Sequence, residues 1–274
     1  MKSNSWRLGG RLVLLCLSLC MLAGCNGERS GGQNPLGGGG GGGPGGGNDR
    51  DRSIGGLWFG VDPISGQDVI GIASEDGDFH FVREDLVQYA GEADTDGTTV
   101  TGEFVGFTPP GFEFEDGSTR GTGTLSGLVD EREELQLQIV FTTSAGTQDS
   151  GTITLRYDDV YERDSSLSTI AGNYSIRGTN GVVNVNSNGV VFAQNSTTGC
   201  TANGEVSVID PRYNAYRVEW TYSACAGDFS VLNGLTFSGL ATLDNTTGSD
   251  LGVVLATANS GSNRIAEIWV FDRA

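Results

Sequence analysis

Apolar and polar residues alternate along short runs of this chain, most clearly in residues 135–141, 152–157 and 216–222. In the first run every odd-numbered residue is leucine, isoleucine or phenylalanine, and the even-numbered residues up to 138 are glutamine. A period of two is typical of an antiparallel strand with one buried face. Helical periodicity is absent from every window of eleven residues. The pattern therefore predicts an all-β protein built from many short strands.

Turn signals separate these runs. Asn188-Gly189 lies between two apolar stretches, 182–185 and 190–192, and predicts a β-hairpin whose turn residues both have positive φ. The same kind of dipeptide punctuates the first half at Asp76-Gly77, Asp96-Gly97 and Asp116-Gly117. Glycines also fall inside predicted strands, as at Gly121, Gly123 and Gly127, where they permit bends and close approach of neighbouring groups.

The folded part of the chain divides into two similar halves, 54–163 and 167–274, joined by the polar segment 162–166. Each half contains about eight strands connected by short turns. The two edge strands of such an up-and-down sheet would expose unpaired backbone groups, and the simplest way to avoid this is for the sheet to close into a barrel. We expect two tandem antiparallel up-and-down β-barrels, lipocalin-like or avidin-like in architecture alone. Two small β-sandwiches are the alternative.

Charge narrows the range of partners. The formal net charge is −18, and it becomes −21 when Lys2, Arg7 and Arg11 are removed with residues 1–24. Such a surface repels phosphate backbones, so we expect no nucleic-acid partner. Lys2 is the only lysine and His80 the only histidine, which disfavours Schiff-base chemistry and most metal sites. No cofactor and no metal ion is predicted.

The first 25 residues combine positive charge, an apolar run and a cysteine. A positive start precedes an apolar run, 12–22, that is too short to cross a bilayer comfortably. The run ends in Leu22-Ala23-Gly24-Cys25, which resembles the bacterial lipobox. The resemblance implies that residues 1–24 are a signal peptide, that Cys25 is acylated and becomes the first residue, and that the protein is lipid-anchored. Two or more acyl chains anchor stably.

Residues 25–53 read as a flexible tether, because Gly37 to Gly43 and Gly45 to Gly47 are unbroken glycine. Asn26 is not the aspartate that commonly retains lipoproteins in the inner membrane, so the outer membrane is expected, with the face undetermined. The lipobox, the tandem halves and the joint at 161–167 together resemble a group of uncharacterised proteobacterial lipoproteins with tandem β-domains. That resemblance implies no activity.

Cys16 and Cys20 leave with the signal peptide, and the remaining pair, Cys200 and Cys225, is predicted to form a disulfide in an oxidising compartment. Matching the apolar faces of two strands pairs Val206 with Val218 and Val208 with Tyr216. That register sets Cys200 opposite residue 224, one short of its partner, so a bulge or a frayed strand end is needed. The bridge is expected to be structural.

Aromatic residues are the strongest candidates for ligand binding. Trp58, Trp220, Tyr222 and Trp269, with Phe59 and Phe271, lie on predicted strands and can line a barrel interior or simply form its core. Pro109-Pro110-Gly111-Phe112 reads as an exposed loop that could touch a partner.

The polar candidates are weaker. His80 alternates with Phe79 and Phe81 and is expected on the solvated face of its strand. Asp94-Thr95-Asp96-Gly97 starts like a calcium loop but lacks its later ligands, and a turn explains it better. Glu113, Glu115 and Asp116 form a second acidic cluster.

Three functions remain open. A non-catalytic binding or scaffolding module of the cell envelope, acting on an envelope protein, is favoured, since residues for catalysis are scarce. A carrier of a small apolar ligand inside a barrel comes second and requires an internal cavity. A hydrolase that uses a pair of carboxylates is third, and we expect no enzyme.

Overall fold

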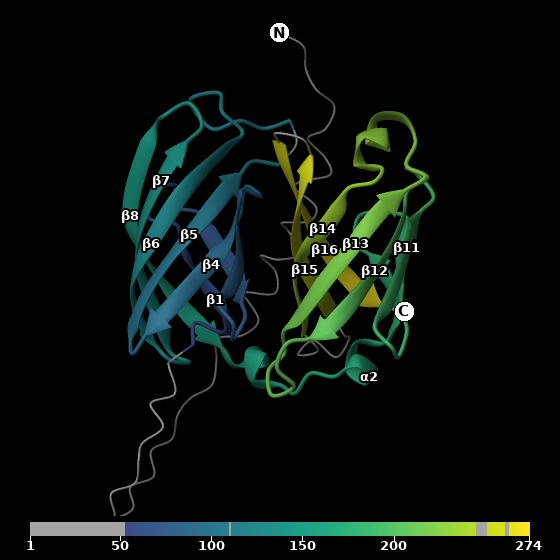
Figure 1. Ribbon diagram of the computed structural model, residues 1–274, viewed down its shortest axis with the longest axis horizontal. Coiled ribbons are helices and arrows are strands. Elements are labelled where there is room, and N and C mark those ends of the chain that lie inside the picture. The colour runs from purple at the N-terminus through teal and green to yellow at the C-terminus, as the bar shows by residue number, and fades with distance from the viewer. Residues whose placement is uncertain (1–52, 110, 245–250, 261–262) are drawn as a thin grey trace, which may run out of the picture. The chain divides into compact units, whose positions relative to one another are not determined.

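The computed structural model describes residues 53–109, 111–244, 251–260 and 263–274, and Figure 1 shows the strands they form. Cys25 and the tether predicted at 25–53 lie outside these residues, apart from Ser53. Asp51–Ala274 is a compact unit containing two closed antiparallel β-barrels. The prediction of an all-β fold made of two tandem barrels is confirmed, and the alternative of two sandwiches is wrong, because the first and last strands of each sheet pair with one another.

The first barrel consists, among the described residues, of eight strands in sequence order: β1 (Gly56–Val61), β2 (Asp68–Ala73), β3 (Asp78–Arg83), β4 (Gln88–Asp96), β5 (Thr99–Phe107), β6 (Arg120–Asp130), β7 (Glu134–Thr143) and β8 (Gln148–Asp158). The barrel closes where β1 pairs with β8, from Leu57 opposite Asp158 to Gly60 opposite Leu155. The predicted strands at 135–141 and 152–157 lie within β7 and β8.

The chain then passes through a 3₁₀ turn, η1 (Asp159–Glu162), and a single helical turn, α2 (Leu167–Ile170). Ser166 caps α2 by accepting from the amide of Thr169. The segment 162–166, predicted from its polarity to join the two halves, connects these turns.

The second barrel contains β9 (Gly172–Ile176), β10 (Gly181–Val185), β11 (Val190–Asn195), β12 (Thr201–Val208), β13 (Tyr216–Ser223), η2 (Gly227–Leu232), β14 (Thr236–Asp244), β15 (Leu251–Ser260) and β16 (Asn263–Arg273). It closes through β9, which pairs with β10 on one side and with β16 on the other. The run predicted at 216–222 lies within β13.

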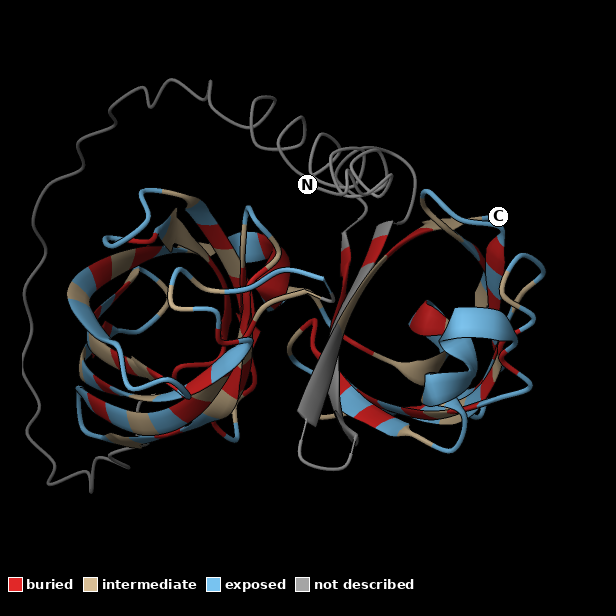
Figure 2. Ribbon diagram, turned by 90° about the horizontal axis from the view of Figure 1, so that it is seen from above, coloured by how far each residue is buried: buried red, intermediate tan, exposed pale blue. Residues whose placement is uncertain are grey.

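The interiors follow from the strand period of two. In Figure 2 buried and exposed residues alternate along the strands of both barrels. Phe79 and Phe81 on β3 point into the first barrel, whereas Val206 and Val218 belong to the core of the second. Of the described helices, none is long and apolar enough to span a bilayer.

The hairpin predicted at Asn188-Gly189 is present and joins β10 to β11, but its turn differs from the expectation. Gly189 has a φ of +83°, whereas Asn188 is not among the described residues with positive φ. The amide of Gly189 donates to the carbonyl of Asn186, and the amide of Asn186 donates to the carbonyl of Val190. Three residues therefore lie between Asn186 and Val190, and a single left-handed glycine reverses the chain.

The disulfide between Cys200 and Cys225 is present. The predicted register is confirmed, since Val206 pairs with Val218 and Val208 with Tyr216. The ladder ends at Thr201 opposite Ser223, and Ala224 has a φ of +58°. This left-handed residue is the irregular strand end that the offset between the cysteines requires.

Candidate functional site

The two ends of the first barrel differ. At one end, four large apolar side chains are fully buried, with exposed fractions of 0% for Trp58 and Val100, 1% for Leu135 and 2% for Val129. At the other end lie the connections 62–67, 84–87, 108–119 and 144–147. The first barrel is thus a cup with a closed floor and an open mouth.

A cavity of about 730 Å³ occupies the open half of this cup. This size falls within the range of about 300–1,000 Å³ that is usual for small-molecule sites. Aliphatic residues line part of it, among them Leu125, Leu137 and Ile139. Its aromatic lining, among the described residues, consists of Phe79, Phe81, Tyr89, Phe104, Phe112, Phe114 and Phe141.

The rings on β5 and β7 are arranged around glycines on β6. Phe104 and Phe141 both pair with Gly123, and their rings are parallel within 6° with centroids 6.0 Å apart. A Cβ on Gly123 would lie 2.3 Å from Cζ of Phe104, and one on Gly121 would lie 2.5 Å from Cζ of Phe141. Tyr89 meets both rings edge-on, with centroids 5.6 and 6.0 Å away. The inward-facing glycines therefore provide the room in which these rings lie.

Arg83, at the end of β3, is the one guanidinium in the described lining. Its side chain is 13% exposed and lies 2.9 Å from the buried carboxylate of Asp62. It also binds Asp85 in bidentate fashion, at 3.0 and 2.5 Å, and Nη1 donates to the Tyr89 hydroxyl at 3.4 Å. Burial alone would lower the pKa of Arg83, but the hydrogen bond and charge of Asp85 outweigh it and raise that pKa. Burial raises the pKa of Tyr89, so its hydroxyl stays neutral.

Asp116 lies in the loop 108–119 at the mouth. It accepts hydrogen bonds from the Ser118 amide at 3.0 Å, from the Ser118 hydroxyl at 2.6 Å and from the Thr143 hydroxyl. These bonds hold the pKa of Asp116 well below its usual range. An acid held ionised in this way is poorly suited to donate a proton.

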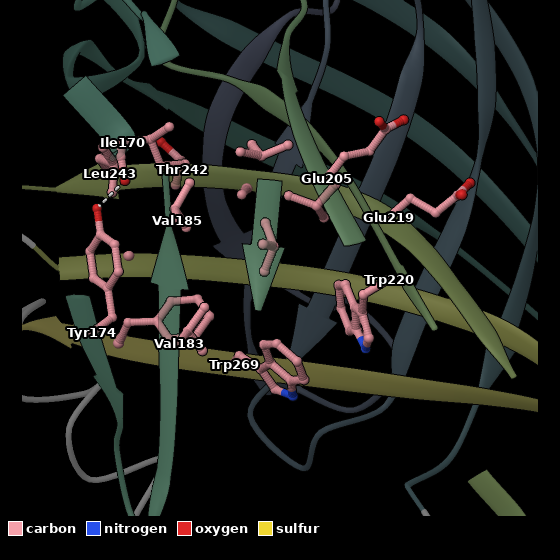
Figure 3. Close-up of a pocket in the computed structure, with 16 residues that line it drawn as sticks. Ile170, Tyr174, Val183, Val185, Glu205, Glu219, Trp220, Thr242, Leu243 and Trp269 are labelled. Atoms are coloured by element: carbon pink, nitrogen blue, oxygen red, sulfur yellow. Dashed lines mark hydrogen bonds between the residues drawn. The ribbon is translucent and has the colours of Figure 1, made fainter. Parts of the chain in front are cut away.

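The described side chains of the second barrel form a packed core. A pocket within this core has a volume of about 50 Å³. Figure 3 shows the indole rings of Trp220 and Trp269 side by side, and their centroids are 4.3 Å apart. In the same view the carboxylates of Glu205 and Glu219 point away from the rings. The pocket is large enough for a few water molecules but falls well below the usual size of a small-molecule site.

A half-buried acid, Glu267, lies beside this core. The Tyr222 hydroxyl donates to Oε2 of Glu267 at 2.8 Å. Burial raises the pKa of Glu267 to about 7, although the hydrogen bonds from Tyr222 and Trp269 oppose the shift. Nothing in the local sequence around Glu267 distinguishes it from the exposed acids of other strands.

The aromatic candidates chosen from the sequence are not together in one site. Trp58 lies in the floor of the first barrel, where its Nε1 donates to the Ile54 carbonyl at 2.9 Å, and it does not line the cavity. Trp220 and Trp269 line the small pocket of the second barrel, and Tyr222 packs edge-on against Trp269. The larger cavity instead uses mainly phenylalanines that were not singled out from the sequence as ligand-binding candidates; Phe79, Phe81 and Phe112 were named there, but for other roles.

Among the polar candidates, Glu113, Glu115 and Asp116 do line the cavity. Phe112 is 63% exposed, as expected of its loop, and also lies at the mouth; Pro110 is outside the described residues. His80 lies on the opposite face from Phe79 and Phe81, as predicted, and is half-buried rather than fully exposed. Asp94 and Asp96 end β4, and Gly97, with a φ of +59°, makes the turn.

Within the described ranges, no three His, Cys, Asp or Glu side chains are grouped so as to hold a metal ion. Comparison with models of protein families finds no match, and comparison with curated proteins finds no significantly similar sequence. The site must therefore be interpreted from its own geometry.

Proposed function

We propose that this protein is a lipid-anchored carrier of the cell envelope that holds a small molecule with an apolar body inside its first barrel. The observation that carries the proposal is the cavity of about 730 Å³, which is open at one end and lined with aromatic and aliphatic side chains. A carrier requires such an internal space, and this requirement moves our preference from a scaffolding module to the carrier.

The second barrel supports the proposal by contrast. Both barrels have eight paired strands among the described residues, yet the pocket found among the described side chains of the second has a volume of only about 50 Å³. A closed sheet of eight strands can be filled by its own side chains. The larger space in the first barrel is thus a property of its particular residues and not of the architecture.

A cavity-filling variant tests the proposal. Ile139 points inward and lines the cavity, whereas the next residue, Val140, points outward. We expect the chain from Asn26 to Ala274 to bind the neutral fluorophore N-phenyl-1-naphthylamine at one site, and Ile139→Trp to weaken binding at least tenfold. Val140→Trp adds the same ring outside the cavity and should bind like the parent. Equal binding by both variants would place the fluorophore elsewhere and overturn the proposal.

The anchor is tested separately. Cleavage and acylation at Cys25 predict a mature chain that begins at this residue and fractionates with outer membranes. Intact-mass analysis of the membrane-extracted protein should show the acyl chains, and Cys25→Ser should abolish them. Recovery of unchanged, unacylated protein from the soluble fraction would contradict the anchor and leave the ligand site standing.

A further inference from the structure

We propose that the ligand of the first barrel is a cationic amphiphile, with an apolar body among the phenylalanines and an amine or quaternary ammonium at the mouth. This inference rests on the proposed carrier function and adds the chemical class of the ligand. Its basis is the charge of the lining: among the described residues the cavity has six carboxylates (Asp62, Asp85, Glu113, Glu115, Asp116, Asp149) and one guanidinium.

The guanidinium does not offer a site for an anion. Arg83 is bound by both Asp62 and Asp85, so this group carries one net negative charge. An incoming carboxylate or phosphate would have to displace a partner and leave a buried carboxylate unpaired, which is costly. Arg120, which follows the loop 108–119, pairs with Phe107 on the outer side of β5, where alternation with Phe104 and Gly106 places it.

Asp149 places negative charge inside the mouth itself. It lies directly opposite Phe141 on β7, and paired residues of antiparallel strands project to the same face. It also shares that face of β8 with Ile153 and Leu155, which line the cavity below it. Along this strand the lining changes from aliphatic to anionic towards the opening, as an amphiphile with a positive head requires.

The acidic residues of the loop 108–119 add further negative charge at the mouth of the cavity. Glu113 and Glu115 are exposed and line the mouth beside Asp116, whose lowered pKa keeps it ionised. Clustered charge of one sign around a low-dielectric cavity attracts ions of the opposite sign and repels those of the same sign. An acyl chain that ends in a carboxylate or phosphate should be disfavoured.

Three amphiphiles with twelve-carbon chains distinguish a cationic from a neutral or anionic ligand: dodecyltrimethylammonium, tetraethylene glycol monododecyl ether and dodecanoate. We expect calorimetry on the chain from Asn26 to Ala274, below the critical micelle concentrations and at low salt, to give a Kd for the cation at least tenfold lower than for the other two. Higher salt should narrow the difference, because exposed charges are screened.

Charge variants locate the effect. Asp149→Asn with Glu113→Gln should reduce the preference for the cation at least threefold. Asp94→Asn with Glu103→Gln removes the same charge from the outer face of β4 and β5 and should change the preference much less. If the ether and the cation bind equally well, the inference fails while the carrier function stands. If none of the three binds, both fail.

Discussion

Phe104 and Phe141 lie parallel across Gly123, and the cavity exists because β6 presents no side chain between them. A methyl group at Gly123 would lie 2.3 Å from Phe104 and 2.6 Å from the Val140 carbonyl oxygen. The ring can rotate away, but the backbone oxygen cannot. The backbone of the sheet itself therefore requires a glycine at this position, and the absence of a side chain here leaves space for the two rings.

Gly123→Ala should destabilise the protein by about 1–3 kcal/mol, as overpacking does, and should also weaken binding of the naphthylamine probe. Thr122→Ala alters the adjacent, exposed position and serves as the control. Chemical unfolding and fluorescence titration measure the two effects. Unchanged stability and unchanged binding would show that the rings do not depend on this glycine.

Glu267, the half-buried acid of the second barrel, predicts an unusual pH dependence of stability. The pKa of Glu267 is about 7 in the folded protein, against an ordinary value of 4.5. Between these values the folded protein keeps a proton that the unfolded chain has lost, so the contribution of Glu267 to stability falls as the pH rises from about 4.5 to 7. The loss should be about 2 kcal/mol after allowance for partial exposure.

Glu267→Gln retains an oxygen that can accept from Tyr222 but cannot ionise. The difference in unfolding free energy between parent and variant should therefore change across this pH window and stay constant above it. Glu219→Gln, on the exposed face of β13, makes the same substitution at an exposed position and serves as the control. A pH-independent difference for Glu267→Gln would mean that the carboxyl of Glu267 titrates normally.

Local patterns in the sequence were sufficient to predict the strands and one register. The alternation in 216–222 identified β13, and matching apolar faces placed Val206 opposite Val218, because the face that a strand buries is set by its own residues. The φ of Asn188 was predicted incorrectly because the dipeptide Asn188-Gly189 alone does not reveal how many residues lie in the loop between the paired strands, and the loop length decides which residues need a positive φ.

The cavity was harder to predict because it depends on residues distant in sequence. Closure pairs Leu57 with Asp158, and no local pattern shows which strands meet. The alternation of side chains along its strand shows that Trp58 points into the barrel, but it does not show whether Trp58 lies at the floor or at the mouth of the barrel. The inward positions of β6, where Gly121 and Gly123 are followed by Leu125, were the available signal, because small residues on an inner face leave space.

Removal of Arg83 should be far more damaging than removal of an exposed arginine. Arg83→Met leaves the buried carboxylate of Asp62 without its charged partner, and a loss of about 3 kcal/mol is expected. Adding Asp62→Asn should restore part of this loss, and a double-mutant cycle measures the coupling. Arg156→Met breaks an ion pair in which the arginine is 75% exposed and should cost less than about 1 kcal/mol. Similar losses for both arginines would refute the role of Arg83.

The disulfide is expected to stabilise the second barrel. Cys200 and Cys225 are separated by 25 residues, and a bridge closing a loop of this length stabilises a protein by about 3 kcal/mol on the chain-entropy model. The bridge joins the ends of β12 and β13, where the ladder has already stopped and Ala224 departs from the extended conformation. Reduction should therefore release the strand ends without changing the pairing of Val206 with Val218. We expect dithiothreitol to lower the melting temperature of the parent to that of a Cys200→Ser, Cys225→Ser variant, and to leave the variant unaffected.

The naphthylamine probe is expected to bind in the first barrel, away from the disulfide. Binding should therefore persist in the reduced protein at temperatures below the melting transition. Loss of binding under these conditions would show that the disulfide also supports the ligand site.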